Sequence, residues 1–225
     1  MDIQSVSGFL GAGKTTFINK YLPLLDGLTV VIENEFGQIG LDGQLIEGDT
    51  PVRELRAGCI CCTLATSFQN SINELWDKFH PDHILIEPSG IAMLHDVVSA
   101  CEGAREEGGL DFDISKRITI VSGDVFEDFI EDYPFYLEQV ENAGLILLSH
   151  IDDMPNGTDE VVERLRGYNS DAVIYSGDWR ELDGDVLMSL VQASPQRPAE
   201  PSDEQHSVDA GQVFSNFAIL KPPAL

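Results

Sequence analysis

Short runs of consecutive apolar residues recur along the chain, and stretches with helical spacing separate them. Six of these runs are rich in β-branched residues, which predicts strands. The predicted strands are Ile3–Ser7, Thr29–Asn34, His83–Glu87, Arg117–Ser122, Leu145–Ser149 and Ala172–Tyr175. Several runs are continuously apolar rather than alternating, which is typical of strands that are covered on both faces of a parallel sheet.

The stretches between the strands place apolar residues three or four positions apart, which predicts helices. The predicted helices are Lys14–Leu25, Leu64–Phe79, Ile91–Cys101, Val125–Ile130, Tyr133–Asn142, Asp159–Tyr168 and Gly184–Gln192. Strands that alternate with helices in this way indicate an α/β fold with a doubly wound, mostly parallel sheet. Ligands of such folds bind beyond the carboxyl ends of the strands, so the loops after the first, second, third and fifth strands should converge at one edge.

The composition divides the 225 residues into three parts. Residues 1–193 are expected to form the α/β domain. Residues 194–212 are rich in proline, serine and acidic residues, which predicts a linker. Residues 213–225 have the pattern of a lone strand, which cannot bury its own apolar face and therefore docks on the main domain or begins another one.

Residues 8–15 read GFLGAGKT and match the phosphate-binding loop pattern GxxxxGK[ST] between a predicted strand and a predicted helix. Glycine lets the backbone curl so that successive N–H groups point at one anion, and the dipole of the following helix favours negative charge there. Lys14 would bring its charge to the β- and γ-phosphates, and the Thr15 hydroxyl would ligate Mg²⁺. The predicted phosphate-binding residues are Gly11, Ala12, Gly13, Lys14, Thr15 and Thr16.

Acidic residues lie at the ends of two other predicted strands. Glu33 and Glu35 are two residues apart along an extended chain, so their side chains point to the same side. Glu87 ends the third strand, where a carboxylate is the usual partner of Mg²⁺ or its water in phosphate-loop enzymes, and Gly90 could donate its N–H to a γ-phosphate. We therefore expect Lys14, Glu33 and Glu87 to serve catalysis, with a solvated carboxylate as the alternative for each acid.

The fifth predicted strand ends in the sequence SHID, residues 149–152. A carboxylate at this place can accept hydrogen bonds from the N1–H and the 2-amino group of guanine, whereas adenine offers no such pair of donors. Asp152 is therefore the candidate residue for selecting guanine, and the neighbouring Asp153 is expected to be solvated.

Three of the four cysteines lie in the sequence GCICC, residues 58–62. The thiolates of Cys59, Cys61 and Cys62 would suit zinc, cuprous copper or an iron–sulfur centre, and also cobalt or nickel. A tetrahedral ion would take its fourth ligand from water, from an acid at the end of the second strand, or from a partner chain. Buried thiols and a redox pair are the alternatives. Cys101, alone on an apolar helix, is expected in the core.

Acidic side chains outnumber basic ones by 39 to 13, which gives a net charge of −26. This field repels phosphate backbones and anionic membranes, so neither nucleic acid nor a membrane is an expected partner. It attracts cations and basic protein surfaces, although solubility or a salty cytoplasm explains the charge equally well. The N-terminus has no signal-peptide pattern, and no apolar run reaches the roughly 18 residues of a membrane span, so we expect a cytoplasmic protein.

Taken in order, these segments resemble the CobW/HypB/UreG group of metal-associated GTPases, and most closely its CobW-like branch. The resemblance rests on five segments, GFLGAGKTT (8–16), ENEFG (33–37), GCICC (58–62), EPSG (87–90) and the weaker SHID (149–152). It implies a GTPase that uses Mg²⁺, binds zinc, cobalt or a similar ion at Cys59, Cys61 and Cys62, and reads guanine with Asp152. Residues 11–16 would then bind the phosphates.

The chain departs from the pattern of this family at several places. Ser149 and His150 stand where the family usually has Asn or Thr and then Lys, and Gln38 stands where relatives often carry an acid. The histidine-rich loop that is common in the family is reduced to His206. CobW-like proteins usually have a second, C-terminal domain, of which only residues 213–225 could be the beginning.

The resemblance implies a slow GTPase that acts as a metallochaperone or insertase. Its ligands would be GTP or GDP, Mg²⁺ and Zn²⁺ (or Co²⁺ or Ni²⁺), and its partners a client metalloprotein and a second copy of the chain. A small-molecule kinase with a phosphate-binding loop is one alternative, although such enzymes need more cationic side chains than this chain offers. A non-catalytic metal sensor with a structural nucleotide is the other.

Overall fold

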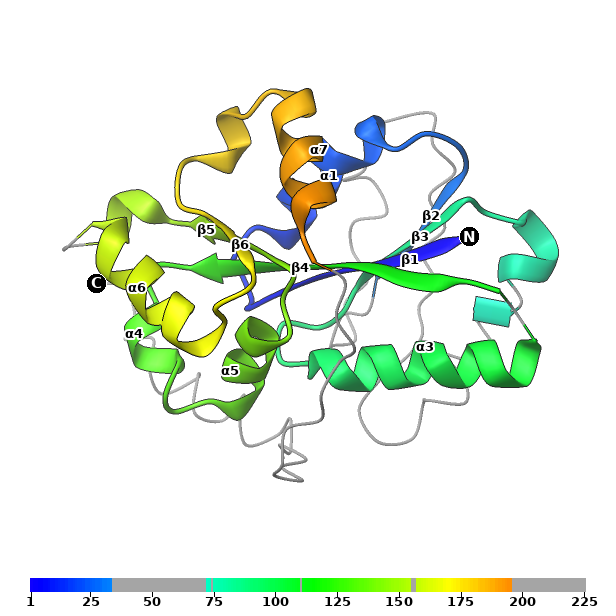
Figure 1. Cartoon of the computed structure of the whole chain (residues 1–225), viewed down its shortest axis with the longest axis horizontal. Helices are drawn as coiled ribbons and strands as arrows, with labels where there is room; N and C mark the ends of the chain where they lie inside the picture. Colours follow the sequence, from blue (N-terminus) through cyan, green and yellow to red (C-terminus); the bar gives the residue numbers. More distant parts are fainter. Residues whose placement is uncertain (34–71, 74, 110, 155–156, 196–225) are drawn as a thin grey trace, which may run out of the picture.

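The computed structural model of the chain describes residues 1–33, 72–73, 75–109, 111–154 and 157–195 (Figure 1). The described elements, in chain order, are β1 (Asp2–Gly8), α1 (Lys14–Tyr21), η1 (Leu22–Leu24), β2 (Thr29–Glu33), β3 (His83–Glu87), α3 (Leu94–Gly108), β4 (Asp113–Ser122), α4 (Phe126–Phe129), α5 (Pro134–Glu141), β5 (Leu145–Ser149), η2 (Ile151–Asp153), α6 (Thr158–Tyr168), β6 (Val173–Tyr175), η3 (Trp179–Glu181) and α7 (Gly184–Ala193). Residues 72–73 and 75–79 are also helical.

The described strands form one sheet in the order β2-β3-β1-β4-β5-β6, and every neighbouring pair is parallel. The prediction of a parallel α/β sheet is therefore confirmed. Because the strands are parallel, their carboxyl ends meet at one edge, where β1 ends at Gly8, β2 at Glu33, β3 at Glu87 and β5 at Ser149. These four strands therefore end at the edge where the sequence predicts the loops to meet, and the loop after β2 lies outside the described residues.

Helices cover both faces of the sheet (Figure 1), with α1 and α7 on one face and α3 and α5 on the other. The face under α1 and α7 is filled by a cluster that includes Phe17, Trp179, Leu187 and Val191. The opposite face holds two clusters, one under α3 and one under α4 to α6. Strands β3 and β5 are thus buried on both sides, which explains their continuously apolar sequences.

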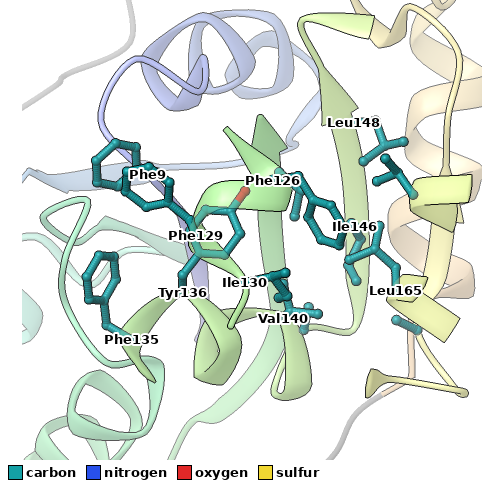
Figure 2. Close-up of a cluster of buried hydrophobic side chains, with 14 of the residues drawn as sticks. Phe9, Phe126, Phe129, Ile130, Phe135, Tyr136, Val140, Ile146, Leu148 and Leu165 are labelled. Carbon is teal, nitrogen blue, oxygen red and sulfur yellow. The ribbon is translucent and has the colours of Figure 1, made fainter. Parts of the chain in front are cut away.

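The cluster under α4 to α6 includes an aromatic side chain from the loop that follows β1 (Figure 2). The Phe9 ring lies with its centroid 4.8 Å from that of Phe129, 6.2 Å from Phe135 and 6.5 Å from Tyr136. Aromatic pairs at these separations pack favourably beyond the area that they bury. The cluster therefore anchors the start of the phosphate-binding loop to α4 and α5.

Several predicted boundaries are wrong. The helix predicted at Ile91–Cys101 begins at Leu94 and runs to Gly108, and the strand predicted at Arg117–Ser122 begins at Asp113. Helix α1 ends at Tyr21 rather than at residue 25, and the next turn is a 3-10 helix with a proline in its first turn. A proline lacks the N–H that an α-helix interior requires, so the regular helix stops before it.

Cys101 is buried in the cluster under α3, as the sequence predicts. The proposed linker and the C-terminal strand lie outside the described residues except for residues 194 and 195, so the division into three parts stays a prediction. None of the described helices has both the length and the apolar character needed to cross a membrane.

Candidate nucleotide-binding site

The loop between β1 and α1 has the backbone that its glycines allow. Gly11 and Gly13 have φ angles of 79° and 105°, in the left-handed region that favours glycine, and Gly13 is the N-cap of α1. The Ala12 N–H donates to the Phe9 carbonyl over 3.1 Å and closes the turn. At Gly8, a Cβ would lie 2.5 Å from the Ile120 carbonyl oxygen of β4, so the loop can leave the sheet here only with glycine.

Three side chains predicted to act together lie side by side at the start of α1. The Thr15 hydroxyl donates to the Glu87 carboxylate, with Oγ1 3.2 Å from Oε1 and 3.3 Å from Oε2. The Lys14 ammonium lies 4.0 Å from Glu87 Oε1 and donates to the Phe9 carbonyl over 3.4 Å. Only 8% of the Lys14 side chain and 14% of the Glu87 side chain are exposed, so water screens this ion pair weakly.

The donor set at this point fits Mg²⁺. Mg²⁺ prefers hard oxygen ligands, and it is usually bound in proteins through one or two carboxylates together with phosphate oxygens and waters. The Thr15 hydroxyl and the Glu87 carboxylate are two such oxygens at hydrogen-bond distance from each other, beside the N-terminus of a helix. They are therefore able to hold the ion of a Mg·nucleotide at this edge of the sheet.

The segment after β3 lies against the phosphate-binding loop. A Cβ on Gly90 would lie 2.7 Å from the Leu10 backbone nitrogen and 3.1 Å from the Phe9 carbonyl carbon. The Ala92 N–H donates to the Ser89 carbonyl over 3.0 Å, which turns the chain toward α3. The Gly90 backbone is thus brought directly beside the loop that is expected to hold the phosphates.

The loop after β5 also contacts the phosphate-binding loop. His150 has a φ of 51°, and its Nε2 lies 3.2 Å from the Gly11 carbonyl oxygen. Asp152 is exposed in η2, which follows at once. Hydrogen bonds to the Asp178 carboxylate raise the pKa of Arg180, and the negative charge of Asp152 raises it further. Asp152 therefore lies within the electrostatic reach of a guanidinium on η3.

Sequence reasoning missed the contribution of η3. The Trp179 side chain is 2% exposed, and a Cβ on Gly13 would lie 3.4 Å from its ring. Its ring also meets Phe17 of α1 edge-on, with centroids 5.9 Å apart. Trp179 therefore supports the first turn of α1 from the side of α7. The only signal in the sequence was a tryptophan in an otherwise polar stretch.

The predicted thiolate ligands Cys59, Cys61 and Cys62 lie outside the described residues, and so does Glu35. Of Glu33, only the backbone at the end of β2 is described. Within the described ranges, His, Cys, Asp and Glu side chains form no group of three or more that could hold a metal ion. The transition-metal site expected at the three cysteines therefore stays a prediction.

Comparison with known proteins identifies the family of the domain that carries these residues. A protein-family model for the nucleotide-binding domain of CobW/HypB/UreG proteins matches residues 2–176. The zinc chaperone CobW of Sinorhizobium sp is 41% identical over 104 residues, which cover 42% of this chain and 29% of that protein. The zinc chaperone YjiA of Escherichia coli (strain K12) is 29% identical over 204 residues, which cover 83% of this chain and 60% of that protein.

Among solved structures, the Zn(II)-bound YjiA GTPase from E. coli matches with a TM-score of 0.62, over 91% of this chain and 67% of that one. The sequence identity is 21%, so this likeness concerns the fold. The chain spans less than two thirds of the length of the two zinc chaperones above.

The family match takes in every strand of the described sheet, the phosphate-binding loop, Glu87 and Asp152. It also takes in the cysteine segment. The chain therefore belongs to the CobW/HypB/UreG family, and residues 2–176 correspond to the nucleotide-binding domain of that family.

Proposed function

We propose that this chain is a Mg²⁺-dependent GTPase that couples its nucleotide state to the binding and delivery of a transition metal. Zinc is the first candidate, because the relatives CobW and YjiA are named zinc chaperones, and cobalt and nickel are the others. The observation that carries the proposal is the contact of Thr15 with Glu87 beside Lys14, within a domain that matches a nucleotide-binding family.

Nucleotide binding would use residues from three segments. Backbone N–H groups of residues 11–16 and the Lys14 ammonium bind the β- and γ-phosphates. Gly90, whose Cα lies beside the Leu10 backbone, would donate its N–H to the γ-phosphate. Asp152 accepts hydrogen bonds from the N1–H and the 2-amino group of guanine, so an adenine would leave its carboxylate unpaired.

Hydrolysis would then proceed by in-line attack of water on the γ-phosphorus. A bond forms between the water oxygen and phosphorus while the bond to the β–γ bridging oxygen breaks, which gives GDP and inorganic phosphate. A Mg²⁺ ion held by Thr15 and Glu87 would supply neutralisation of the phosphate charge. Lys14 would stabilise the charge that develops on the bridging oxygen, and Glu33 or Glu87 would orient the attacking water.

The transition metal would be the cargo of the protein. Cys59, Cys61 and Cys62 offer three thiolates, so the fourth position of a tetrahedral ion stays open for exchange with a client metalloprotein. These cysteines follow a segment that begins at the carboxyl end of β2, the same edge that carries the phosphate-binding loop. Metal coordination and GTP loading would therefore bias each other, and a second copy of the chain could supply the missing ligand.

The proposal is tested by anaerobic titration with Zn²⁺, Co²⁺ and Ni²⁺, with GDP or with a non-hydrolysable GTP analogue and Mg²⁺. We expect thiolate charge-transfer bands with Co²⁺ and Ni²⁺, and a zinc affinity that differs between the two nucleotides. Phosphate release from GTP is measured in parallel and should require Mg²⁺. Equal zinc affinities with both nucleotides would defeat the coupling.

The matched pair of variants is Cys61→Ser with Cys62→Ser against Cys101→Ala. The double variant should lose the charge-transfer bands and retain GDP binding. Cys101 is buried, and burial raises the pKa of its thiol, so the Cys101→Ala variant should keep the bands. Transfer of the γ-phosphoryl group to a metabolite instead of water would favour a kinase, and absence of turnover with every metal would favour a sensor.

A further inference from the structure

Helix α5 carries two buried polar residues that the reaction scheme above does not use. Glu138 and Gln139 are each 1% exposed. Burying a carboxylate or an amide is costly unless its polar atoms are hydrogen-bonded. Both side chains have hydrogen-bond partners among the backbone groups of residues 90–95, which run from Gly90 into the first turn of α3.

Glu138 satisfies the first backbone donors of α3. Its Oε2 accepts from the Leu94 N–H over 2.6 Å, and its Oε1 accepts from the His95 N–H over 2.8 Å. The N-cap residue of α3, Met93, supplies no side-chain cap of its own. The Asn142 amide donates to Glu138 Oε1 over 3.0 Å and fixes the orientation of the carboxylate. A residue of one helix therefore fixes the point at which another helix begins.

Gln139 holds the residues just before that helix. Its Nε2 donates to the Ala92 carbonyl over 2.7 Å and to the Gly90 carbonyl over 3.4 Å. The backbone of Gln139 is fixed in turn, because the Thr119 hydroxyl of β4 donates to its carbonyl over 3.0 Å. The segment from residue 90 to residue 95 is thus bound at both ends by neighbouring residues of α5.

The same helix is packed against the phosphate-binding loop. Phe135 and Tyr136 of α5 surround the Phe9 ring together with Phe129 of α4 (Figure 2). The backbone of Gly90 lies against the backbone of Phe9 and Leu10. Helix α5 therefore sets the position of the phosphate-binding loop and of the Gly90 segment relative to each other.

We propose that Glu138 and Gln139 are positioning residues that hold the Gly90 N–H where it meets the γ-phosphate of GTP. This inference rests on the proposed GTPase function. A diphosphate has no γ-phosphate for Gly90 to contact, so the two residues discriminate GTP from GDP without touching either nucleotide. They transmit the presence of the γ-phosphate through α3 and α5 rather than through the loop alone.

The test compares Gln139→Met with Gln192→Met. Methionine has nearly the shape of glutamine but no amide, so the Ala92 and Gly90 carbonyls lose their donor. Gln192 is an exposed residue of α7 and undergoes the same chemical change away from the site. We expect Gln139→Met to lower the affinity for a non-hydrolysable GTP analogue and the kcat for GTP by about tenfold, with the GDP affinity within about twofold of wild type.

Gln192→Met should leave all three quantities unchanged. A purely structural role for Gln139 would lower the unfolding midpoint and leave the ratio of the GTP-analogue and GDP affinities at its wild-type value, and that result overturns the inference. If the wild-type protein neither binds nor hydrolyses GTP, the proposed function itself fails, which is a distinguishable outcome.

Glu138→Gln provides a second measurement if Gln139→Met folds poorly. The amide oxygen can accept from only one of the two backbone donors that the carboxylate serves, so the start of α3 is loosened without removing its cap entirely. We expect faster amide hydrogen exchange at residues 90–95 in this variant. In the wild type, the GTP analogue should slow this exchange more than GDP does, and the variant should show a smaller difference between the two nucleotides. An unchanged protection difference would overturn the inference.

Discussion

Gly90 has no room for a side chain beside the phosphate-binding loop. An alanine Cβ would lie 2.7 Å from the Leu10 backbone nitrogen, and backbone cannot swing aside as a side chain would. Gly90→Ala should therefore push the segment away from the phosphate-binding loop and lower kcat for GTP at least about tenfold. Phosphate release under saturating Mg·GTP measures this effect.

The control for that substitution is Gly167→Ala in α6. Nothing lies within 4 Å of a Cβ at Gly167, and alanine is the better helix former, so this variant should gain roughly 0.5–1 kcal/mol in unfolding free energy at unchanged activity. Wild-type turnover in Gly90→Ala would show that the close approach to Leu10 does not matter for the reaction.

His150 stands where the CobW/HypB/UreG family usually has a lysine, and its ring contacts the phosphate-binding loop. Its Nε2 lies 3.2 Å from the Gly11 carbonyl oxygen, and 42% of its side chain is exposed. His150→Lys would add an aliphatic stem beside the base that Asp152 is proposed to read. We expect the affinity ratio of GDP to ADP to rise several-fold, measured by competition against a fluorescent guanine nucleotide.

His150→Ala is the control that distinguishes an effect of the lysine side chain from an effect of the backbone conformation at position 150. Both variants keep a Cβ at the same left-handed φ of 51°, so backbone strain is similar in the two. His150→Ala should weaken both nucleotides about equally, because it removes the contact with the loop and adds no discrimination. Equal GDP-to-ADP ratios in all three proteins would contradict a role for position 150 in base selection.

At the scale of elements, Asn169 joins the end of α5 to the start of β6. Its Nδ2 donates to the carbonyls of Val140, Glu141 and Ala143 over 2.8, 3.1 and 2.9 Å, and its Oδ1 accepts from the Ala172 N–H. Asn169→Ala would leave several buried backbone groups without this hydrogen-bond partner, so it should lower the unfolding free energy by roughly 2–4 kcal/mol. Urea denaturation measures this loss, and a change below about 1 kcal/mol would contradict the argument.

The contact between α5 and α3 also makes stability depend on pH. Burial raises the pKa of Glu138 above its ordinary value, although its hydrogen bonds to Leu94 and His95 oppose this. The folded protein then holds a proton that the unfolded chain releases, so the contribution of Glu138 is complete below about pH 4.3 and is lost as the pH rises through the folded pKa. Between pH 5 and 8, wild-type stability should therefore fall relative to Glu138→Gln.

Equilibrium denaturation of both proteins at each pH measures that difference. The glutamine variant has no proton to release at this position, so the comparison cancels the titrating groups that do not interact with Glu138. His95, whose Nδ1 lies 3.5 Å from Glu138 Oε1, and Asp96 are the neighbours that it does not cancel. A difference in unfolding free energy that stays constant from pH 5 to pH 8 would show that the carboxyl group has the same pKa in the folded and unfolded states.

The sequence predicted the sheet because buried parallel strands are continuously apolar, as in Leu145 to Leu148. It failed where polar residues occupy regular structure. β4 extends back to Asp113 through Ser115 and Lys116, since the Lys116 ammonium reaches the Gln192 and Ser194 carbonyls at the surface. Helix α3 extends to Gly108 through a charged turn that has no apolar period.

The site was predictable only where local sequence defines the chemistry. The phosphate-binding loop has a fixed spacing, and Glu87 ends an apolar strand, so both could be found and the structure brings them together. Glu138 and Gln139 gave no signal, because their partners are backbone groups of a segment far away in the chain. Hydrogen bonds to a distant backbone leave no pattern in either segment.

For the whole molecule, the excess of negative charge is the dominant long-range term. A net charge of −26 on 225 residues repels itself in the compact state, and added salt screens this repulsion. Raising KCl from 0.1 M to 1 M shortens the screening length from about 10 Å to about 3 Å, so we expect the thermal unfolding midpoint to rise by several degrees. Differential scanning fluorimetry across this range measures the rise.

A variant with fewer acidic side chains distinguishes the screening of charge repulsion from other effects of salt on stability. Glu102 and Glu106 are exposed, one turn apart on α3, and like charges at this spacing repel. Replacing both by glutamine should raise the thermal unfolding midpoint at 0.1 M KCl. The further rise of this midpoint between 0.1 M and 1 M KCl should then be smaller than in the wild type.

Surface ion pairs, such as those of Arg164 with Glu127 and Glu131, are weakened by salt. If these pairs outweighed the repulsion, the midpoint would fall as KCl is added, so the sign of the salt effect decides which interaction governs the stability of the molecule.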